Sequence, residues 1–413
     1  MAEPTRSDPQ PDPRAATAAA TAAARKLRQT ANAEARSLTV AGSRLTLITD
    51  GPERLAALLA LIDGAEKSLR LLYYIYTDDA AGAAVRDSLS RALARGVRVS
   101  LLIDGFGSSK TPDTYFKALH EAGAEFCRFL PSYGRRYLIR NHQKMTLADE
   151  ARVLIGGFNI EDSYFGAKED GAWRDLGLMV EGPAAARLAP YYDSLIGWAI
   201  GKGGRIRTLR RIIRSYSETQ GVLQWSFGGP MRRMSPWVAA TCRDLTQSND
   251  VEMIAAYFAP TYGMLKRIAR IGKRGRARVI TAGKSDNTAT IAAARFTYGR
   301  LLKRGVEIFE YRPTKLHTKL VVLDDVVHIG SSNFDIRSLY LNLEMMLRVA
   351  SPAFATMMRL YFEGELQDSL RITPALHRKR ATLAHRIKWA LSFFLVTTGD
   401  YTVTRRLNFG SGN

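Results

Sequence analysis

The chain has 413 residues, 46% of them hydrophobic, and carries a formal net charge of +21 at pH 7. No apolar stretch reaches the ~18 residues that a transmembrane helix needs, so we expect no membrane span. The excess of positive charge indicates a polyanionic partner, either an anionic lipid surface or a nucleic acid. The two cysteines, Cys127 and Cys242, stand at unmatched places, which favours a reducing compartment over a disulfide framework.

Residues 1–40 form the first segment and are rich in Pro, Ala and Thr, without a pattern that could pack. We interpret this segment as a flexible, low-complexity tail. It lacks a basic region followed by an apolar region, so the sequence indicates no signal peptide.

Two similar halves follow, at 41–200 and 221–365. The run SLRLLYYIYTDD (68–79) parallels DVEMIAAYFAP (250–260), and ALARGVRVSLLIDG (92–105) parallels IGKRGRARVITAG (271–283). Each half alternates apolar strands with amphipathic helices, which is typical of a layered α/β fold. We therefore predict two tandem α/β/α sandwich halves that face each other across one cleft.

A His-x-Lys-x-x-x-x-Asp pattern occurs once in each half, as His142, Lys144 and Asp149 and again as His317, Lys319 and Asp324. The neighbouring residues are apolar or β-branched, so both patterns are predicted to lie on buried strands. Residues two apart on a strand share a face, so each histidine and its lysine should point the same way. The aspartate, at an odd offset of seven, should instead shape the strand end and its turn.

A glycine-led turn ending in asparagine follows each pattern. Gly156, Gly157 and Gly330 would let the backbone approach a ligand closely, and Asn159 and Asn333 offer neutral donors to a phosphoryl oxygen.

Two His-Lys pairs with two nearby asparagines are suited to phosphodiester transfer. One neutral imidazole can attack phosphorus and form a covalent intermediate, while a second donates and accepts the proton. The lysines and asparagines would neutralise the phosphoryl oxygens. No metal or cofactor is required, and the remaining histidines and the two cysteines show no ligand spacing.

At these residues the sequence resembles the phospholipase D superfamily, and more narrowly the bacterial cardiolipin synthases, over roughly residues 44–375. The motifs that carry the resemblance are RNHQK (140–144), GGFNIEDSY (156–164), AGKSD (282–286) and GSSNFDIRSLYLNLE (330–344). The resemblance implies a phospholipase D-like pseudo-dimer with mixed sheets and one active site at the interface of its halves.

The resemblance also implies roles for individual residues. The six motif residues form the catalytic set, with His142 as nucleophile and His317 as general acid and base. A carboxylate from the opposite half would support each imidazole: Glu344 for His142 and Asp175 for His317. The turn after Asp324 is one residue shorter than the turn after Asp149.

Two basic segments remain. Residues 201–220 form a predicted linker in which Ile206, Leu209 and Ile213 could share a helical face, and residues 366–413 form a basic C-terminal tail. Both are interpreted as amphipathic pieces suited to a membrane surface. The alternative is a solvated linker and a frayed tail.

The function implied is a cardiolipin synthase-like phosphatidyltransferase. It would move a phosphatidyl group from phosphatidylglycerol to a second phosphatidylglycerol and release glycerol. A hydrolase that uses water as acceptor is the first alternative, a nuclease the next, and a binding module is disfavoured because both motifs are intact.

The expected partners are anionic phospholipid and a membrane surface, with no nucleic acid. The expected location is the periphery of a bacterial cytoplasmic membrane, on its cytoplasmic side. The sequence leaves open the preferred acceptor alcohol, the donor head group and the oligomeric state.

Overall fold

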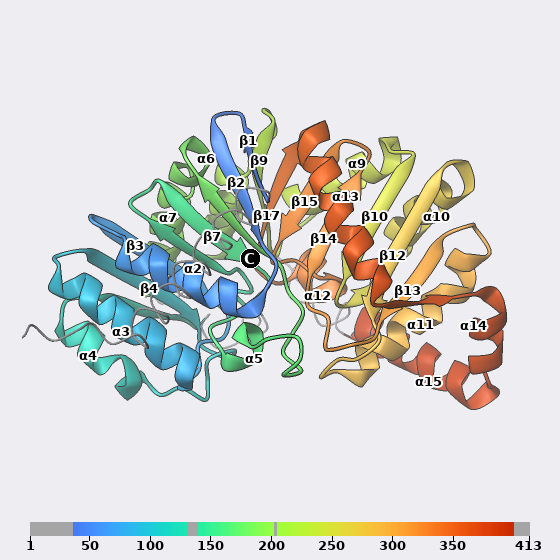
Figure 1. Cartoon of the computed structure of the whole chain (residues 1–413), viewed down its shortest axis with the longest axis horizontal. Helices are drawn as coiled ribbons and strands as arrows, with labels where there is room; N and C mark the ends of the chain where they lie inside the picture. The colour runs from blue at the N-terminus through green and yellow to red at the C-terminus, as the bar shows by residue number, and fades with distance from the viewer. Residues whose placement is uncertain (1–35, 131–138, 202–204, 400–413) are drawn as a thin grey trace, which may run out of the picture.

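The computed structural model describes residues 36–130, 139–201 and 205–399 of the chain. They form two α/β halves side by side, each with one eight-stranded mixed sheet (Figure 1). The predicted fold class, two similar sandwich halves of phospholipase D type, is confirmed.

The first sheet has the strand order β1-β2-β8-β7-β6-β3-β4-β5. Its strands are β1 Ser37–Val40, β2 Ser43–Ile48, β3 Ser68–Tyr73, β4 Arg98–Asp104, β5 Glu125–Phe129, β6 Met145–Ala148, β7 Arg152–Gly156 and β8 Gly177–Glu181. The strands β3, β4 and β5 are parallel, and the remaining pairings are antiparallel.

The second sheet has the order β18-β13-β12-β10-β14-β15-β17-β9. Its strands are β9 Leu223–Gly228, β10 Asp250–Ala255, β12 Arg276–Ala282, β13 Glu307–Tyr311, β14 Lys319–Leu323, β15 Val326–Gly330, β17 Glu344–Ala350 and β18 Ser369–Ile372. A two-stranded pair, β11 Phe258–Ala259 and β16 Phe334–Asp335, lies beside it. The order β8-β7-β6-β3-β4-β5 repeats as β17-β15-β14-β10-β12-β13, so the duplication seen in the sequence is a duplication of topology.

Helices cover the faces of both sheets (Figure 1). Those of the first half are α2 Gly51–Asp63, α3 Ala80–Ala94, α4 Lys117–Glu121, α5 Asp162–Phe165, α6 Pro183–Ala186 and α7 Ala189–Ile200, with the 3-10 turn η1 Asp113–Phe116. Those after it are α8 Ile206–Tyr216, α9 Pro236–Gln247, α10 Tyr262–Arg274, α11 Thr288–Leu302, α12 Ile336–Tyr340, α13 Pro352–Gln367, α14 Pro374–Arg380 and α15 Leu383–Phe394, which continues into the π-helical turn η2 Leu395–Gly399.

Polar residues set the starts of several helices. The Asp79 carboxylate accepts a hydrogen bond from the Gly82 amide at the start of α3, and the Thr261 hydroxyl accepts one from the Met264 amide at the start of α10. These bonds satisfy amides that have no partner within the helix.

One hydrophobic cluster is shared by the two halves. It includes Leu147 and Tyr191 of the first half and Phe227 and Leu343 of the second. The rings of Tyr191 and Phe227 stack with centroids 3.7 Å apart. Because apolar side chains of both halves pack in the same cluster, the two halves are held in a fixed relation.

Two of the expected boundaries were wrong. The strand β1 lies within residues 37–40, which were predicted to be tail, while residues 1–35 lie outside the described part of the chain. The strand β18 lies beyond residue 365 and extends the second sheet by pairing with β13. The edge of β13 offers unpaired backbone groups, and β18 satisfies them.

The predicted basic linker is also part of the fold. Ile206, Leu209 and Ile213 do lie on one face of helix α8, as expected. However, Leu209 and Ile213 are fully buried, and Ile206 packs against the same cluster. This apolar face is therefore covered by protein, which contradicts its predicted role at a membrane surface.

In the described part of the chain, no helix combines the length and apolar character needed to cross a bilayer.

Candidate active site

The buried strands predicted for the two motifs are present as β6 and β14, but each histidine lies just before its strand. His142 and Lys144 precede β6, whereas His317 precedes β14 and Lys319 is its first residue. Each histidine belongs instead to a short segment that pairs with the opposite half. The His142 amide donates to the Leu343 carbonyl over 2.9 Å, and the His317 amide donates to the Arg174 carbonyl over 2.7 Å.

This crossing of segments explains how each imidazole meets its carboxylate. Leu343 directly precedes Glu344, and Arg174 directly precedes Asp175, so the pairing places an acid from one half beside the histidine of the other. Nδ1 of His142 lies 3.1 Å from Oε1 of Glu344, and Nδ1 of His317 lies 2.7 Å from Oδ2 of Asp175. These are the pairs that the resemblance implied.

The two carboxylates differ in their electrostatics. Burial raises the pKa of Glu344 to about 8, although the charge of Lys144 and the hydroxyl of Ser331 oppose this shift. Burial also acts to raise the pKa of Asp175, but the contact with His317 and the charge of Lys319 outweigh it and hold that pKa below its usual value. Asp175 is therefore an ionised acid at neutral pH, whereas Glu344 is mostly protonated.

Both imidazoles are neutral in the unliganded site. Burial, followed by the charges of the two lysines, lowers the pKa of His142 well below its usual value. Burial and the charge of Lys319 lower the pKa of His317 to about 3. A bound anionic phosphodiester would act in the opposite direction and favour the imidazolium form.

The two lysines occupy equivalent positions. Nζ of Lys144 donates to the His142 carbonyl, and Nζ of Lys319 donates to the His317 carbonyl. Burial lowers the pKa of Lys319 to about 8 and that of Lys144 well below its usual value. Burial thus disfavours the charged form of both lysines, whereas a phosphoryl anion bound beside them would favour it.

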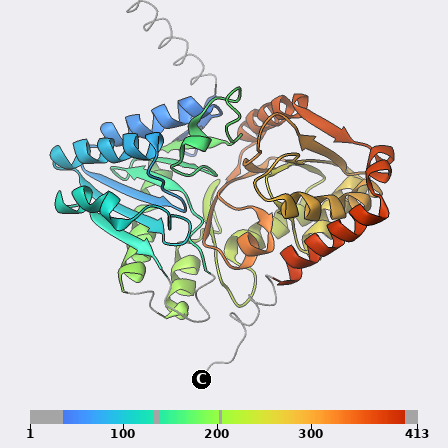
Figure 2. The same cartoon turned by 90° about the horizontal axis from the view of Figure 1, so that it is seen from below.

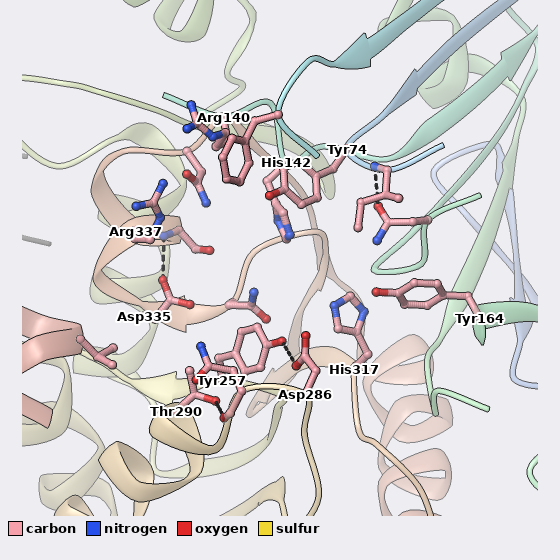
Figure 3. A pocket seen from close by; sticks show the side chains of 18 residues that line it. Tyr74, Arg140, His142, Tyr164, Tyr257, Asp286, Thr290, His317, Asp335 and Arg337 are labelled. Atoms are coloured by element: carbon pink, nitrogen blue, oxygen red, sulfur yellow. Dashed lines mark hydrogen bonds between the residues drawn. The ribbon is translucent and has the colours of Figure 1, made fainter. Parts of the chain in front are cut away.

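A cavity of about 630 Å³ opens between the halves, and both histidines and both asparagines, Asn159 and Asn333, line it. Figure 3 shows the two imidazoles facing this common space from opposite halves. Asn159 uses Oδ1 to accept from the Ile75 amide, which leaves its amide group as the donor. Oδ1 of Asn333 is buried without a hydrogen-bond partner.

Aromatic side chains hold the imidazoles in place, and sequence reasoning assigned no role to them. The ring of Tyr74 lies 5.0 Å from that of His142, while Tyr164 and Trp173 lie 5.1 and 5.3 Å from His317. Tyr164 lies in the run GGFNIEDSY, and Trp173 lies two residues before Asp175, so their positions near motif residues could have indicated a place in the site.

Other residues on the cavity wall were also missed. Arg140 and Arg337 lie together on one side of the cavity, and Tyr257, Asp286 and Thr290 lie on another (Figure 3). The guanidinium of Arg140 stacks 4.2 Å from the ring centroid of Phe106. The phenol of Tyr257 donates to Asp286 over 2.7 Å.

Two of the glycines lie where the backbone comes close to other parts of the protein. A Cβ atom on Gly157 would lie 2.7 Å from Oδ2 of Asp175 and 3.0 Å from Nζ of Lys319. A Cβ atom on Gly330 would lie 2.1 Å from the Met345 carbonyl. Only glycine leaves room at these two positions.

Asp149 and Asp324 are not among the residues that line the cavity. Asp149 accepts hydrogen bonds from the amides of residues 66–68, and Asp324 accepts from those of Asn249 and Asp250. Both have positive φ, 54° and 46°. They fix turns at the far ends of β6 and β14, as their odd offset indicated, and the shorter second turn does not alter this arrangement.

Among the described residues, no group of three or more His, Cys, Asp or Glu side chains is placed to hold a metal ion.

Solved structures support the fold. Phosphatidylserine synthase from Haemophilus influenzae Rd KW20 matches with a TM-score of 0.65 over 87% of this chain and 94% of its own, at 15% identity. Polyphosphate kinase from Porphyromonas gingivalis matches with a TM-score of 0.54 over 80% of this chain and 49% of its own, at 14% identity. At these identities the likeness concerns architecture alone.

The relatives found by sequence identify the family more specifically than the solved structures do. A cardiolipin synthase from Alkalihalophilus pseudofirmus is 30% identical over 348 residues, covering 82% of this chain and 69% of the relative. Cardiolipin synthase A from Pseudomonas entomophila is 28% identical over 344 residues, covering 81% and 71%. A cardiolipin synthase from Geobacillus kaustophilus is 31% identical over 313 residues, and the match spans 62% of that relative's length.

The family model described as "Cardiolipin synthase, PLD-like domain" matches residues 58–190 and 242–366, one segment in each half. Each matched segment contains one His-Lys motif and the carboxylate that supports the other motif. The chain therefore belongs to the cardiolipin synthase family of PLD-like proteins, and it is a phosphatidyltransferase enzyme.

Proposed function

We propose that the chain makes cardiolipin by transferring a phosphatidyl group from one phosphatidylglycerol to a second, with release of glycerol. The observation that carries this proposal is the paired site, in which two histidines from different halves, each with a carboxylate at Nδ1, line one cavity. Such a pair supplies a nucleophile and a proton donor for one phosphorus atom.

Binding of the anionic phosphodiester beside Asp175 favours the imidazolium form of His317. In the first step, Nε2 of His142 attacks phosphorus, the bond from phosphorus to the glycerol oxygen breaks, and the His317 imidazolium donates a proton to that oxygen. The product is a phosphatidyl group bound to His142 through a P–N bond. In the second step, His317 removes the proton from the hydroxyl of the incoming lipid, whose oxygen displaces His142 from phosphorus.

The carboxylates support this division of roles. Asp175 is ionised beside His317, so it stabilises the imidazolium that a proton donor must reach. Glu344 is mostly neutral beside His142, so it favours the unprotonated ring that a nucleophile needs. Lys144, Lys319, Asn159 and Asn333 would neutralise charge on the phosphoryl oxygens.

The choice of phosphatidylglycerol as acceptor is supported by Arg140 and Arg337 on the cavity wall. Burial lowers the pKa of His142, and the charge of Arg337 adds to that shift. Burial raises the pKa of Tyr74, and the charge of Arg337 opposes that shift. Arg337 therefore lies within electrostatic reach of the reacting phosphorus. A second anionic lipid would find positive charge there, whereas water or a neutral alcohol would gain nothing from it.

The test is incubation of the full chain with phosphatidylglycerol vesicles, followed by mass spectrometry of the lipids. Cardiolipin and glycerol are the expected products. Phosphatidic acid as the main product would instead identify a hydrolase, and no lipid turnover combined with cleavage of DNA or RNA would identify a nuclease.

A second arm tests the acceptor. Arg337→Gln should lower transfer to phosphatidylglycerol more than transfer to ethanol from the same donor. Equal losses with both acceptors would show that Arg337 does not select the acceptor.

We also propose that the protein works at the periphery of the bacterial cytoplasmic membrane, on its cytoplasmic side. The supporting observations are the net charge of +21 and the lipid substrates of the family.

A further inference from the structure

Helix α15 carries an apolar stripe that no other described part of the chain covers. Leu383, Ile387, Leu391 and Phe394 are exposed by 75, 61, 56 and 56%, and Leu395, at the start of the next turn, by 57%. At ~100° per residue, positions spaced by four, four and three fall on one side of a helix. These five residues are called the α15 stripe below.

The opposite side of α15 is bound to the protein. Trp389 is buried, Phe393 packs against Phe296 of α11 with ring centroids 4.9 Å apart, and His377 stacks on Trp389 at 5.5 Å. The helix is therefore a fixed element of the second half whose outer side remains apolar. Trp389 and Phe393 therefore face the protein.

The charged residues next to the α15 stripe along the chain are all basic. Arg386 and Lys388 are exposed and flank it on either side, and Arg378 and Lys379 of α14 are exposed just before it. The sequence has no aspartate or glutamate between Ser369 and Gly399. An apolar stripe between basic residues is the pattern of a helix that lies in the plane of an anionic membrane surface.

The C-terminal end of the α15 stripe lies next to the catalytic cavity. Val396, which follows Leu395, lines the catalytic cavity together with Asn287 and Thr290 at the start of α11. In the view from below, α15 runs along the edge of the second half and ends near the junction of the halves (Figure 2). Phe106, which lines the same cavity from the first half, is 55% exposed.

We propose that the α15 stripe docks the enzyme on an anionic lipid bilayer and sets the mouth of the catalytic cavity against the lipid head groups. Leu395 and Phe106 would then meet the bilayer on the two sides of the mouth, so a phosphatidyl head group enters without its acyl chains leaving the membrane. This inference rests on the proposed function for the identity of the lipid, but its binding step can be measured without turnover.

Vesicle binding by the full chain is the first test. The variant with Leu383→Gln, Ile387→Gln and Leu391→Gln should bind phosphatidylglycerol-containing vesicles at least about tenfold more weakly, because it loses the apolar part of the interaction. Leu360→Gln is the matched control, since Leu360 is 70% exposed but lies on α13, away from α15 in Figure 1. Unchanged binding by the triple variant, or an equal loss in the control, would overturn the proposal.

The basic residues beside the α15 stripe provide a second test of vesicle binding. Arg386→Gln with Lys388→Gln should reduce the preference for anionic over neutral vesicles and the sensitivity to salt, because exposed charges act through a screened interaction. The apolar, salt-resistant part of the binding should persist in this variant. An unchanged preference for anionic vesicles would place the basic docking surface elsewhere.

A direct test keeps the stripe apolar and the fold intact. Tryptophan introduced as Leu391→Trp should be quenched by brominated lipids, whereas Leu360→Trp should not be. Equal quenching at both positions, or none at position 391, would contradict the proposed orientation. If the triple variant lost an oligomeric state in lipid-free buffer while keeping vesicle binding, the stripe would be an interface between copies of the chain.

Turnover separates this inference from the proposed function. The triple variant should lose activity on vesicles far more than on short-chain lipid dispersed in detergent. If the unaltered enzyme binds vesicles but transfers no phosphatidyl group, the docking surface is supported and the proposed reaction is contradicted.

Discussion

Asp175→Asn and Glu344→Gln form a matched pair of substitutions that distinguishes the two halves of the active site. Each keeps the size of the side chain and removes one carboxylate from one imidazole. A structure with equivalent halves would respond equally to both. The structure described here predicts unequal responses, because burial raises the pKa of Glu344 to about 8, whereas Asp175 remains ionised.

The expected magnitudes follow from the contacts. Oδ2 of Asp175 lies 2.7 Å from Nδ1 of His317, which places the charge centres of carboxylate and imidazolium roughly 4 Å apart and gives an interaction of about 4 kcal/mol at an effective dielectric constant of about 20. Its loss should lower kcat about 10³-fold. Glu344→Gln removes a group that is mostly neutral at pH 7, so the loss is that of a hydrogen bond, about tenfold.

The assay is transfer from short-chain phosphatidylglycerol under saturating conditions, with circular dichroism to verify folding. A second substrate isolates the role of His317. A phosphatidyl ester of p-nitrophenol has a leaving group that needs no proton, so Asp175→Asn should retain its burst of p-nitrophenol while losing transfer from phosphatidylglycerol. Equal losses in both variants, or loss of the burst in Asp175→Asn, would refute the asymmetry.

Other predictions test separate parts of the account. The kcat/KM profile should fall as pH rises through about 8, because Lys319, whose pKa is lowered to about 8, is charged only below that value; a constant rate up to pH 10 would contradict this. Activity should persist in excess EDTA, because lysines and asparagines neutralise the phosphoryl oxygens, and complete loss reversed by one specific metal would contradict the proposed mechanism. Leu209→Ala should lower the free energy of unfolding by about 2–5 kcal/mol, measured by chemical denaturation, whereas a solvated linker would give no change. Gly157→Ala should abolish transfer, since its Cβ would lie 2.7 Å from Oδ2 of Asp175; a fully active variant would show that Asp175 can move without consequence.

The sequence predicted the architecture well because the duplication is visible in its hydrophobic pattern. The runs that repeat at 68–79 and 250–260 contain the equivalent strands β3 and β10, and those at 92–105 and 271–283 contain their parallel neighbours β4 and β12. The paired motifs also indicated one shared site, and the odd offset of Asp149 and Asp324 correctly indicated turns.

The sequence could not reveal which apolar faces are covered. Helices α8 and α15 both read as basic amphipathic segments, yet α8 buries Leu209 and Ile213 against the shared cluster while α15 leaves its stripe exposed. The difference depends on tertiary packing, because α8 contacts α7 and β9 and its apolar face joins the cluster that both halves share. The two histidines lie just outside the predicted strands β6 and β14 for a similar reason, because their backbone amides pair with the opposite half and not with their own sheet.

The tyrosines and arginines of the cavity were missed because each comes from a different element. Tyr74, Arg140 and Arg337 converge only after the two halves assemble. No spacing in the sequence marks them as neighbours.

The most direct test of the account is to trap the covalent intermediate. The His317→Ala variant, incubated with the p-nitrophenyl substrate and analysed by peptide mass spectrometry at alkaline pH, should carry a phosphatidyl group on His142 in near-stoichiometric amount. His142→Ala should carry none. An adduct on His317 in the His142→Ala variant, or phosphatidyl transfer that proceeds with neither histidine modified, would contradict the assignment of His142 as the nucleophile.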